Sequence, residues 1–374
     1  MYQRIDGLLK LSHNADEGQG ASGGRRDGTI SFMTNPHHNR FYDMAPRIVR
    51  LEHRSEVLAG NPWNDPVARQ VQVYLPPGYE QGDQAYPVIW YLAAYTNSGA
   101  SCGNWRGFEE GVFQRVERLI TSEAMGPVIV AAPDCFTALG GNQYLDSPAL
   151  GNYASYLHRE LVPLIDRQFR TLPGREHRAV LGKSSGGYGA LNSVMQFPQY
   201  WGAMASHAGD MGFEWVYKPE FPACALRLSK AGSVDRFIQQ FWASEKRGAA
   251  EFSTLMCLCL AASYDPDLEN PRQLRLPFDL ETLELDPKRW QRWKEHDPLE
   301  MLESYLHPLK SLRAIHVDCG DMDEYQIQFG NRRYHKALQR LGVPHHYEEF
   351  QGTHRRLDHR LDISLPVLYE AIKA

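Results

Sequence analysis

The segment that most constrains the fold of this chain is Arg178-Ala-Val-Leu-Gly-Lys-Ser-Ser-Gly-Gly-Tyr-Gly-Ala190. Strand-forming residues lead directly into Gly182-Lys-Ser-Ser-Gly186, and a helical pattern follows as far as Phe197-Pro198. This order predicts a Gly-x-Ser-x-Gly nucleophile elbow, a sharp strand-to-helix turn that holds its central serine, Ser184, in a strained conformation. The two glycines are needed because a Cβ at either position would collide with the neighbouring strand or helix. We therefore expect the Ser184 hydroxyl at a helix N-terminus, where the dipole favours developing negative charge.

Two other interpretations of the same residues are weaker. Gly182-Lys183-Ser184 could close a phosphate-binding P-loop, but that motif needs a glycine five residues before Gly182, and position 177 is His. Ser185 could be the nucleophile, but an elbow centred on Ser185 would need glycine in place of Lys183. Ser184 is therefore the predicted nucleophile.

Composition and charge exclude several classes of protein. The chain has 374 residues, of which 43% are hydrophobic, enough for a large α/β domain with a substantial core. A formal net charge of -5 gives no sign of a nucleic-acid or anionic-membrane partner. No apolar run approaches the ~18 residues of a membrane span, and no apolar stretch near Met1 suggests a signal peptide. We expect a cytoplasmic protein.

The cysteines and histidines do not predict a metal site. The six cysteines show no metal-ligand spacing, because Cys257-x-Cys259 lacks a second pair, and we expect them to be buried free thiols. His37-His38 has no third ligand nearby and is typical of a solvated loop.

Periodicity predicts one domain, residues 46–374, after a flexible N-terminal tail, residues 1–45, that is polar and without sustained pattern. Strands alternate with helices at a spacing that favours a mostly parallel sheet covered on both faces, opened by an antiparallel hairpin. Strands are expected at 47–53, 70–75, 86–92, 127–132, 202–206, 314–318 and 345–350 and directly before the elbow, and helices at about 108–121, 153–170, 325–341 and 361–372, besides the elbow helix.

The alternation stops between residues 211 and 308, a segment rich in aromatic residues that looks helical in pieces. The segment leaves and rejoins the sheet at the carboxyl ends of strands, so we expect a cap-like insertion over the edge that bears Ser184. Its aromatic side chains, with Trp215 and Trp242 as candidates, are expected to wall the acyl side of a pocket.

Two later loops can supply partners for the serine. A serine hydroxyl is a poor nucleophile until a base takes its proton and a carboxylate orients that base. In sheets of this kind the acid and then the histidine follow the serine in the chain, each on a loop after a strand. The loops at 319–325 and 351–354 satisfy this order.

Several motifs together carry a family resemblance. Pro76-Pro-Gly-Tyr79, the strand Pro87 to Leu92, the elbow, Cys319-Gly-x-x-Asp323 and Gly352-x-His354 resemble the Putative esterase family of α/β-hydrolases. This family includes esterase D-type S-formylglutathione hydrolases, feruloyl esterases, enterochelin esterases and antigen 85 mycolyltransferases. The resemblance covers roughly residues 47–210 and 311–372. It implies an α/β-hydrolase fold and a serine carboxylic-ester hydrolase (a carboxylesterase) acting on small-molecule esters without a metal or organic cofactor.

Carried over position by position, the resemblance places the acid at Asp323, with Asp321 and Asp318 as nearby alternatives. The family's Gly-x-His places the base at His354, with His359 as the alternative.

The resemblance also implies an oxyanion hole made of two backbone N–H groups. One belongs to Ser185, the residue after the nucleophile. The other is expected from Tyr95, but the family's usual His-Gly at that strand end is replaced here by Ala93-Ala94. Because backbone groups do this work, the replacement is compatible with activity and leaves the conformation of the loop open.

Two other functions are compatible with the same motifs. The triad also supports transfer of the acyl group to an alcohol in place of water. A catalytically silent binding module could use the same fold as a scaffold, although the complete Ser, Asp, His order argues against it.

Overall fold

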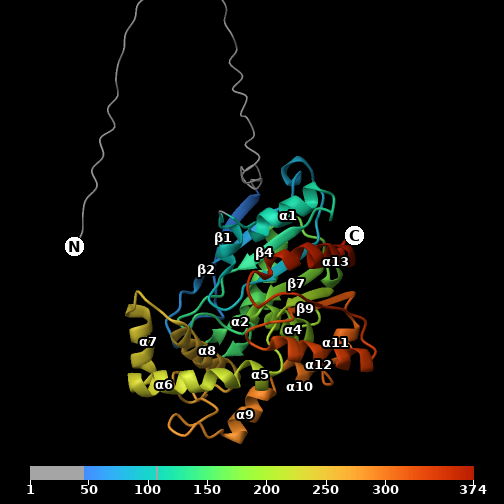
Figure 1. Ribbon diagram of the computed structural model, residues 1–374. Helices are drawn as coiled ribbons and strands as arrows, with labels where there is room; N and C mark the ends of the chain where they lie inside the picture. The colour runs from blue at the N-terminus through green and yellow to red at the C-terminus, as the bar shows by residue number, and fades with distance from the viewer. Residues whose placement is uncertain (1–45, 107) are drawn as a thin grey trace, which may run out of the picture. The chain divides into compact units, whose positions relative to one another are not determined.

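The computed structural model describes residues 46–106 and 108–374. The predicted N-terminal tail, residues 1–45, lies outside the described residues. In the described part the expected alternation of strands and helices is present, and it stops between β8 (Ala203–His207) and β9 (Ala314–Gly320) (Figure 1).

The main sheet has eight strands in the order β1-β2-β4-β3-β7-β8-β9-β10. The first two strands form the expected antiparallel hairpin, and β2 also runs antiparallel to β4, whereas the remaining neighbours are parallel. The strands are β1 (Arg47–Arg54), β2 (Ala68–Leu75), β3 (Val88–Leu92), β4 (Ile129–Pro133), β7 (Arg178–Lys183), β8 (Ala203–His207), β9 (Ala314–Gly320) and β10 (His346–Phe350); β5 (Asp146–Ser147) and β6 (Gly151–Asn152) pair separately.

The central strand β3 is apolar on both faces, as its sequence predicts. Every residue from Val88 to Leu92 is buried. Val88, Trp90 and Leu92 belong to one hydrophobic cluster, and Ile89 and Tyr91 belong to the cluster on the other face. A strand buried on both faces reads as a continuous apolar run because side chains alternate between two covered surfaces.

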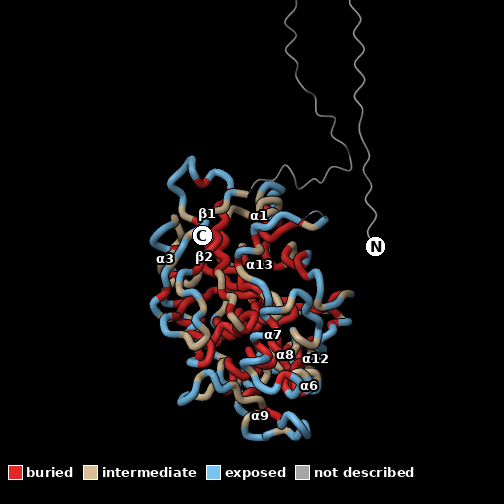
Figure 2. Tube along the Cα trace, turned by 90° about the vertical axis from the view of Figure 1, so that its left-hand side faces the viewer, coloured by how far each residue is buried: buried red, intermediate tan, exposed pale blue. Residues whose placement is uncertain are grey.

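Helices cover the two faces unequally. The clusters place α1 (Val112–Thr121) and α13 (Leu361–Ile372) on one face. The other face is covered by α2 (Tyr153–Ser155), α3 (Val162–Gln168), α4 (Ser185–Gln196) and α12 (Ile327–Arg340). Figure 2 shows the buried trace running through the interior between α13 and α8 (Ala249–Tyr264).

The helix expected over 153–170 is present but irregular. Residues Tyr156–Leu161 between α2 and α3 form a π-helical segment, in which the Val162 N–H donates to the carbonyl of Leu157. Pro163 is the second residue of α3, and proline cannot donate the backbone hydrogen bond that would continue a regular α-helix.

The segment between β8 and β9 is helical, and its aromatic residues pack largely on one another. Figure 1 shows α6 (Phe221–Ala231), α7 (Val234–Ala243) and α9 (Pro287–Lys294) together, away from α1 and α13. The Phe221 and Phe278 rings stack with centroids 4.4 Å apart, and Trp293 is fully buried against Phe221. The helices are α5 (Phe213–Val216), α6 (Phe221–Ala231), α7 (Val234–Ala243), α8, α9 (Pro287–Lys294), α10 (Pro298–Met301) and α11 (Leu306–Lys310).

All six cysteines are free and buried, which confirms the prediction of structural thiols. Among the described residues, no helix combines the length and the apolar character needed to cross a membrane.

Candidate active site

Ser184 lies at the junction of β7 and α4, as the elbow motif predicts. Its backbone has φ 53° and ψ −126°, a conformation that an L-residue adopts only when the surrounding structure enforces it. The Ser184 N–H donates to the carbonyl of His207 on β8, and the Ser184 carbonyl accepts from the Tyr188 N–H. These two hydrogen bonds fix the turn from both sides and leave the hydroxyl at the N-terminus of α4.

The two elbow glycines are required by close packing. A Cβ on Gly182 would lie 2.3 Å from the carbonyl carbon of Gly186. A Cβ on Gly186 would lie 2.1 Å from the carbonyl oxygen of Leu92 on β3. Both distances are far inside van der Waals contact, so glycine at these positions is what allows α4 to approach the sheet this closely.

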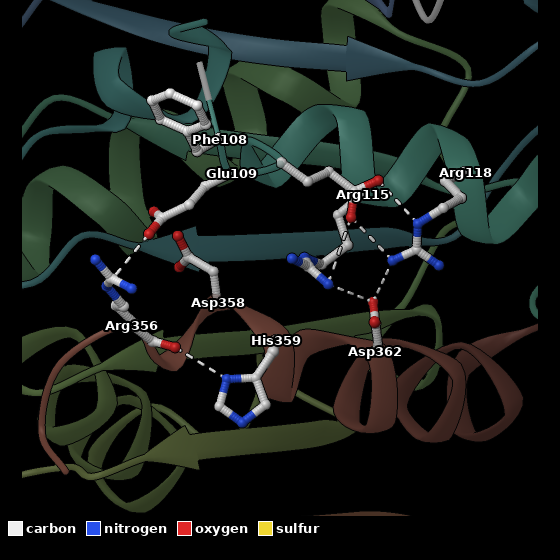
Figure 3. Close-up of a pocket in the computed structure, with 9 residues that line it drawn as sticks. Phe108, Glu109, Arg115, Arg118, Arg356, Asp358, His359 and Asp362 are labelled. Atoms are coloured by element: carbon white, nitrogen blue, oxygen red, sulfur yellow. Dashed lines mark hydrogen bonds and ion pairs between the residues drawn. The ribbon is translucent and has the colours of Figure 1, made fainter. Parts of the chain in front are cut away.

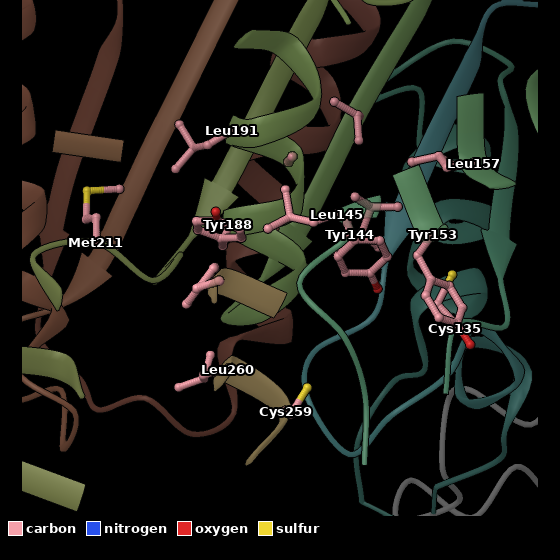
Figure 4. Packing of buried hydrophobic residues seen from close by; sticks show 14 of the residues in the cluster. Cys135, Tyr144, Leu145, Tyr153, Leu157, Tyr188, Leu191, Met211, Cys259 and Leu260 are labelled. Atoms are coloured by element: carbon pink, nitrogen blue, oxygen red, sulfur yellow. The ribbon is translucent and has the colours of Figure 1, made fainter. Parts of the chain in front are cut away.

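The packing against α4 also holds the loop after β3. The Tyr144 ring packs so closely on Gly189 of α4 that a Cβ there would lie 2.4 Å from it. The Tyr144 hydroxyl donates to the Ala93 carbonyl at 2.7 Å. Figure 4 shows Tyr144 beside Leu145 and Tyr188 in this buried cluster. The strand end that carries Ala93 is therefore tied to the elbow helix.

His354 and Asp323 lie together. The His354 Nδ1 is 2.7 Å from Asp323 Oδ2, and Asp323 is only 1% exposed. Because a carboxylate can only accept, Nδ1 is the donor, and in the neutral ring this tautomer leaves a lone pair on Nε2. The Asp323 carboxylate also accepts from the Tyr325 N–H, the His354 N–H donates to Glu324, and the Tyr325 ring packs edge-on against the imidazole.

The alternatives for the acid and base lie elsewhere. Asp321 accepts a hydrogen bond from the Gly352 N–H and so braces the histidine loop. Asp318 lies within β9. His359 donates to the Arg356 carbonyl and lines a separate charged pocket of about 430 Å³ (Figure 3). Of the predicted acids and bases, the structure brings together Asp323 and His354.

Ser184 and His354 line the same cavity, which has a volume of about 680 Å³. Within the described part of the chain, no hydrogen bond joins the Ser184 hydroxyl to the His354 ring. Hydrogen bonds of this kind are often long without substrate and tighten in the complex. The cavity has both apolar and polar walls, formed by Ala94, Tyr95, Thr96, Asn97, Lys183, Ser185, Asp210, Val216, Tyr217, Glu220, Ala249, Phe252, Ser253, Met256, Glu324, Tyr325, Ile327, Arg355, Arg356 and Leu357.

Tyr95 and Ser185, the two residues expected to supply oxyanion donors, both line this cavity. Neither backbone N–H has an acceptor among the residues that the structure describes. The Tyr95 hydroxyl donates to the Leu139 carbonyl at 2.8 Å, and the Thr96 N–H donates to the Gly140 carbonyl. Thr96, the residue after Tyr95, has a positive φ of 66°.

The expectation that Trp215 and Trp242 wall the pocket is wrong. Neither residue lines the cavity. Trp215 is 37% exposed and lies under the Arg333 guanidinium, and the Trp242 indole donates to the Ala138 carbonyl at 3.0 Å. The insertion contributes other aromatic side chains to the cavity, Tyr217 and Phe252.

Sequence reasoning missed two features of the site. Lys183, directly before Ser184, is ion-paired with Asp358, which lies after His354 in the short 3₁₀ helix Leu357–Arg360. Asp210 lines the cavity although it is 5% exposed. The only available signal was the position of Asp210 just after β8, at the same carboxyl edge as Ser184.

Three buried side chains beneath the site have donor atoms within 4.8 Å of one another, namely His207, His316 and Asp318. Asp318 accepts from both imidazoles and from the Arg360 guanidinium, and His207 also bonds Ser364. A guanidinium on the shared carboxylate disfavours a metal cation there, so this group fits a buried hydrogen-bond network better than a metal site.

Comparisons with known proteins agree with this fold. The family model described as Putative esterase matches residues 66–365. Esterase Rv1288 of Mycobacterium tuberculosis is 23% identical over 344 residues, covering 88% of this chain and 59% of the mycobacterial protein. This chain therefore spans less than two thirds of that relative's length.

Two solved structures resemble the chain over most of its length. A ferulic acid esterase has a TM-score of 0.57 at 19% identity and covers 87% of this chain and 98% of its own. The substrate-bound fluorophosphonate-binding serine hydrolase F of Staphylococcus aureus has a TM-score of 0.53 at 15% identity, with 87% and 99% covered. Because the family model matches most of the chain and these structures share its fold, the chain belongs to the Putative esterase family and has the α/β-hydrolase fold.

Proposed function

We propose that the chain is a serine esterase that hydrolyses carboxylic esters of small molecules through an acyl-enzyme intermediate. The main support is that Ser184, on its strained turn, lines one cavity with His354, whose ring is hydrogen-bonded to Asp323. In this proposal Ser184 is the nucleophile, His354 the general base and acid, and Asp323 the residue that orients the imidazole. The N–H groups of Tyr95 and Ser185 form the oxyanion hole.

The reaction proceeds in two steps, acylation of Ser184 and hydrolysis of the acyl-serine. The Ser184 oxygen attacks the ester carbonyl carbon while His354 Nε2 takes the hydroxyl proton, and the tetrahedral oxyanion is held by the two amides. The imidazolium, stabilised by Asp323, gives that proton to the leaving alcohol, which leaves an acyl-serine. Water then attacks the acyl-serine, again losing its proton to His354, and the carboxylic acid departs as the Ser184 hydroxyl is restored.

We further propose that residues 211–308 act as a cap. The segment contributes Val216, Tyr217, Glu220, Phe252 and Met256 to the cavity walls. A wall made by an insertion is suited to selecting substrates, because none of these side chains belongs to the reacting group.

Labelling by a fluorophosphonate probe and turnover of p-nitrophenyl acetate test the proposed nucleophile. Ser184→Ala should abolish both, whereas the matched Ser185→Ala should keep most of both because alanine retains the backbone N–H. Reversed outcomes would show that the elbow is centred on Ser185. Absence of labelling and turnover in the wild-type chain would favour the silent binding module.

Product analysis separates hydrolysis from acyl transfer. With an acceptor alcohol added, an esterase should release the free acid, and formation of a new ester as the main product would favour the acyltransferase. A panel of p-nitrophenyl esters of rising chain length, with feruloyl esters and glutathione thioesters, would locate the preferred substrate.

A further inference from the structure

Asp210 is a buried carboxyl group at the catalytic cavity that the proposed mechanism does not use. It follows β8, the strand next to the elbow strand, and is 5% exposed while lining the cavity shared by Ser184 and His354. A carboxyl group is rarely left this buried without a partner of opposite charge. Within the described residues, no arginine or lysine pairs with Asp210.

Both hydrogen bonds of Asp210 are made by the same carboxyl oxygen. Its Oδ2 accepts from the Tyr217 hydroxyl at 2.9 Å and from the Gln143 amide at 3.3 Å. In the part of the chain that the structure describes, Oδ1 has no hydrogen-bond partner. Tyr217 and Gln143 are themselves 1% and 3% exposed, so these two contacts fix the carboxyl plane. Asp210 Oδ1 is thus held in a fixed orientation and is left to accept a hydrogen bond from a ligand in the cavity.

The same network is short of donors. The Gln143 amide oxygen is also buried without a partner. The Tyr217 hydroxyl is shared between Asp210 and Tyr264, whose hydroxyl oxygen is 3.2 Å away. Asp210 Oδ1, in contrast, is not among the fully buried atoms without a partner, so a ligand in the cavity can bring a hydrogen-bond donor to it.

The surroundings indicate the kind of donor. Besides its charged residues, the cavity that Asp210 lines has an apolar part of its wall, formed by Val216, Phe252, Met256 and Ile327. Burial raises the pKa of Asp210, although the bonds from Tyr217 and Gln143 and the nearby His354 oppose this shift. Both features fit a neutral hydroxyl on an apolar body better than a charged group.

We propose that Asp210 is a specificity-determining residue that binds a hydroxyl group of the ester substrate. The proposal rests on the esterase function proposed above and adds a substrate class, namely esters that carry a hydroxyl group away from the ester carbonyl. The hydroxyl donates to Asp210 Oδ1 while the apolar part of the substrate contacts the cap residues. No bond is made or broken at Asp210.

The test compares esters that differ only in one hydroxyl. Plain alkanoate esters are measured beside ω-hydroxyalkanoate esters of equal chain length, and beside esters with the hydroxyl on the alcohol part. The wild-type kcat/KM should be about 10- to 100-fold higher for at least one hydroxylated series. The series that shows the preference tells which part of the substrate reaches Asp210.

Variants then assign the preference to Asp210. Asp210→Ala should remove the preference and leave turnover of the plain esters nearly unchanged. Asp210→Asn, which can still accept a hydrogen bond, should keep much of the preference. Glu281→Gln, at an exposed carboxylate of the cap segment outside the cavity, should keep all of it. Fluorophosphonate labelling of each variant checks that the site is folded.

Several outcomes would overturn the proposal. A wild-type chain that hydrolyses plain esters but shows no hydroxyl preference would exclude this role of Asp210 while leaving the esterase function intact. An equal loss on all esters in Asp210→Ala would assign Asp210 to holding Tyr217 in place. If Asp210→Ala does not fold, the wild-type comparison and Asp210→Asn remain decisive. A chain that hydrolyses no ester of any kind would remove the proposed function itself.

Discussion

Lys183 and Asp358 form an ion pair that joins the turn of Ser184 to the segment that follows His354. Lys183 directly precedes Ser184, and Asp358 lies after His354 in the 3₁₀ helix Leu357–Arg360. Arg106 also contacts Asp358, at 3.0 Å. Burial alone would raise the pKa of Asp358, but the charges of Lys183 and Arg106 outweigh it and hold that pKa below its usual value. The segments that carry Ser184 and His354 are therefore tied together by a mostly buried ion pair.

Breaking this pair should slow the reaction more than it weakens binding. Lys183→Met should lower kcat by ~10- to 100-fold with little change in KM, because the imidazole is no longer held at the right distance from Ser184. Lys183→Arg should restore most of the rate. Lys373→Met, which breaks the exposed pair with Glu370, is the matched control and should change neither kcat nor KM.

A double-mutant cycle makes this prediction sharper. Asp358→Asn combined with Lys183→Met should cost little more than either single change, because both remove the same interaction. Additive losses in kcat, or a loss no larger than that of the Lys373 control, would contradict a positioning role for the pair.

The proposed role of Asp323 in orienting His354 can be tested by comparing its variant with a variant of the neighbouring Asp321. Asp323→Asn should lower kcat by ~10⁴, since asparagine no longer favours the tautomer with the proton on Nδ1 of His354. Asp321→Asn, which alters only the bond from the Gly352 N–H, should cost far less. Steady-state kinetics on one p-nitrophenyl ester measures both, and a larger loss at Asp321 would move the acid to that position.

Much of this site was predictable because local chemistry determines it. A Gly-x-Ser-x-Gly between strand and helix dictates the strained turn, and the apolar run at 88–92 dictates a strand buried on both faces. Asp323 and His354 follow later strands at the same sheet edge, so the topology brings them together.

Other features depend on packing between distant segments. Lys183 and Asp358 are 175 residues apart in the sequence, and their local patterns contain nothing that pairs them. In the insertion no regular alternation marks which aromatic side chain faces the sheet. Trp215, Trp242 and Phe252 are all aromatic residues in helical stretches of this segment. Of the three, only Phe252 lines the cavity, and the packing of the helices decides this.

The steric role of the elbow glycines predicts a stability loss. Gly186→Ala places a Cβ 2.1 Å from the Leu92 carbonyl oxygen, which neither backbone can avoid without moving α4 from β3. We expect a loss of ~3 kcal/mol or more in unfolding free energy, or failure to fold. Gly82→Ala is the control, because its Cβ would meet nothing closer than 4.0 Å. Equal stability of the two variants in urea unfolding would contradict the predicted contact.

His158 predicts a pH dependence of stability. The ring is fully buried, with Nδ1–H donating to the Ala154 carbonyl and Nε2 accepting from the Trp201 indole. Burial lowers its pKa to about 4, because the protonated ring would lose the Trp201 bond and be poorly solvated. The unfolded chain binds this proton near pH 6.5 and the folded chain only near pH 4, so stability falls as the pH drops through this window.

Protonation of His158 should lower the free energy of unfolding by about 3 kcal/mol between pH 6.5 and 4. His158→Gln should be less stable at pH 7 but should show a flatter decline toward pH 4, measured by urea unfolding at a series of pH values. His359→Gln, at an exposed histidine, should keep the wild-type slope. A slope in His158→Gln as steep as that of the wild type would assign the acid sensitivity to other groups.

The proposed cap makes a last prediction about substrate size. Phe252 on α8 is 40% exposed and forms part of the cavity wall, so Phe252→Ala should enlarge the space beside the acyl chain. The kcat/KM for long-chain p-nitrophenyl esters should rise by ~10-fold relative to the acetate, because a pocket of this kind discriminates by apolar contact. Trp215→Ala and Trp242→Ala change aromatic residues of the same segment outside the cavity, and they should leave the chain-length ranking unchanged. A uniform loss on every ester in Phe252→Ala, together with a lower Tm, would mean that this ring only holds α8 against Phe241.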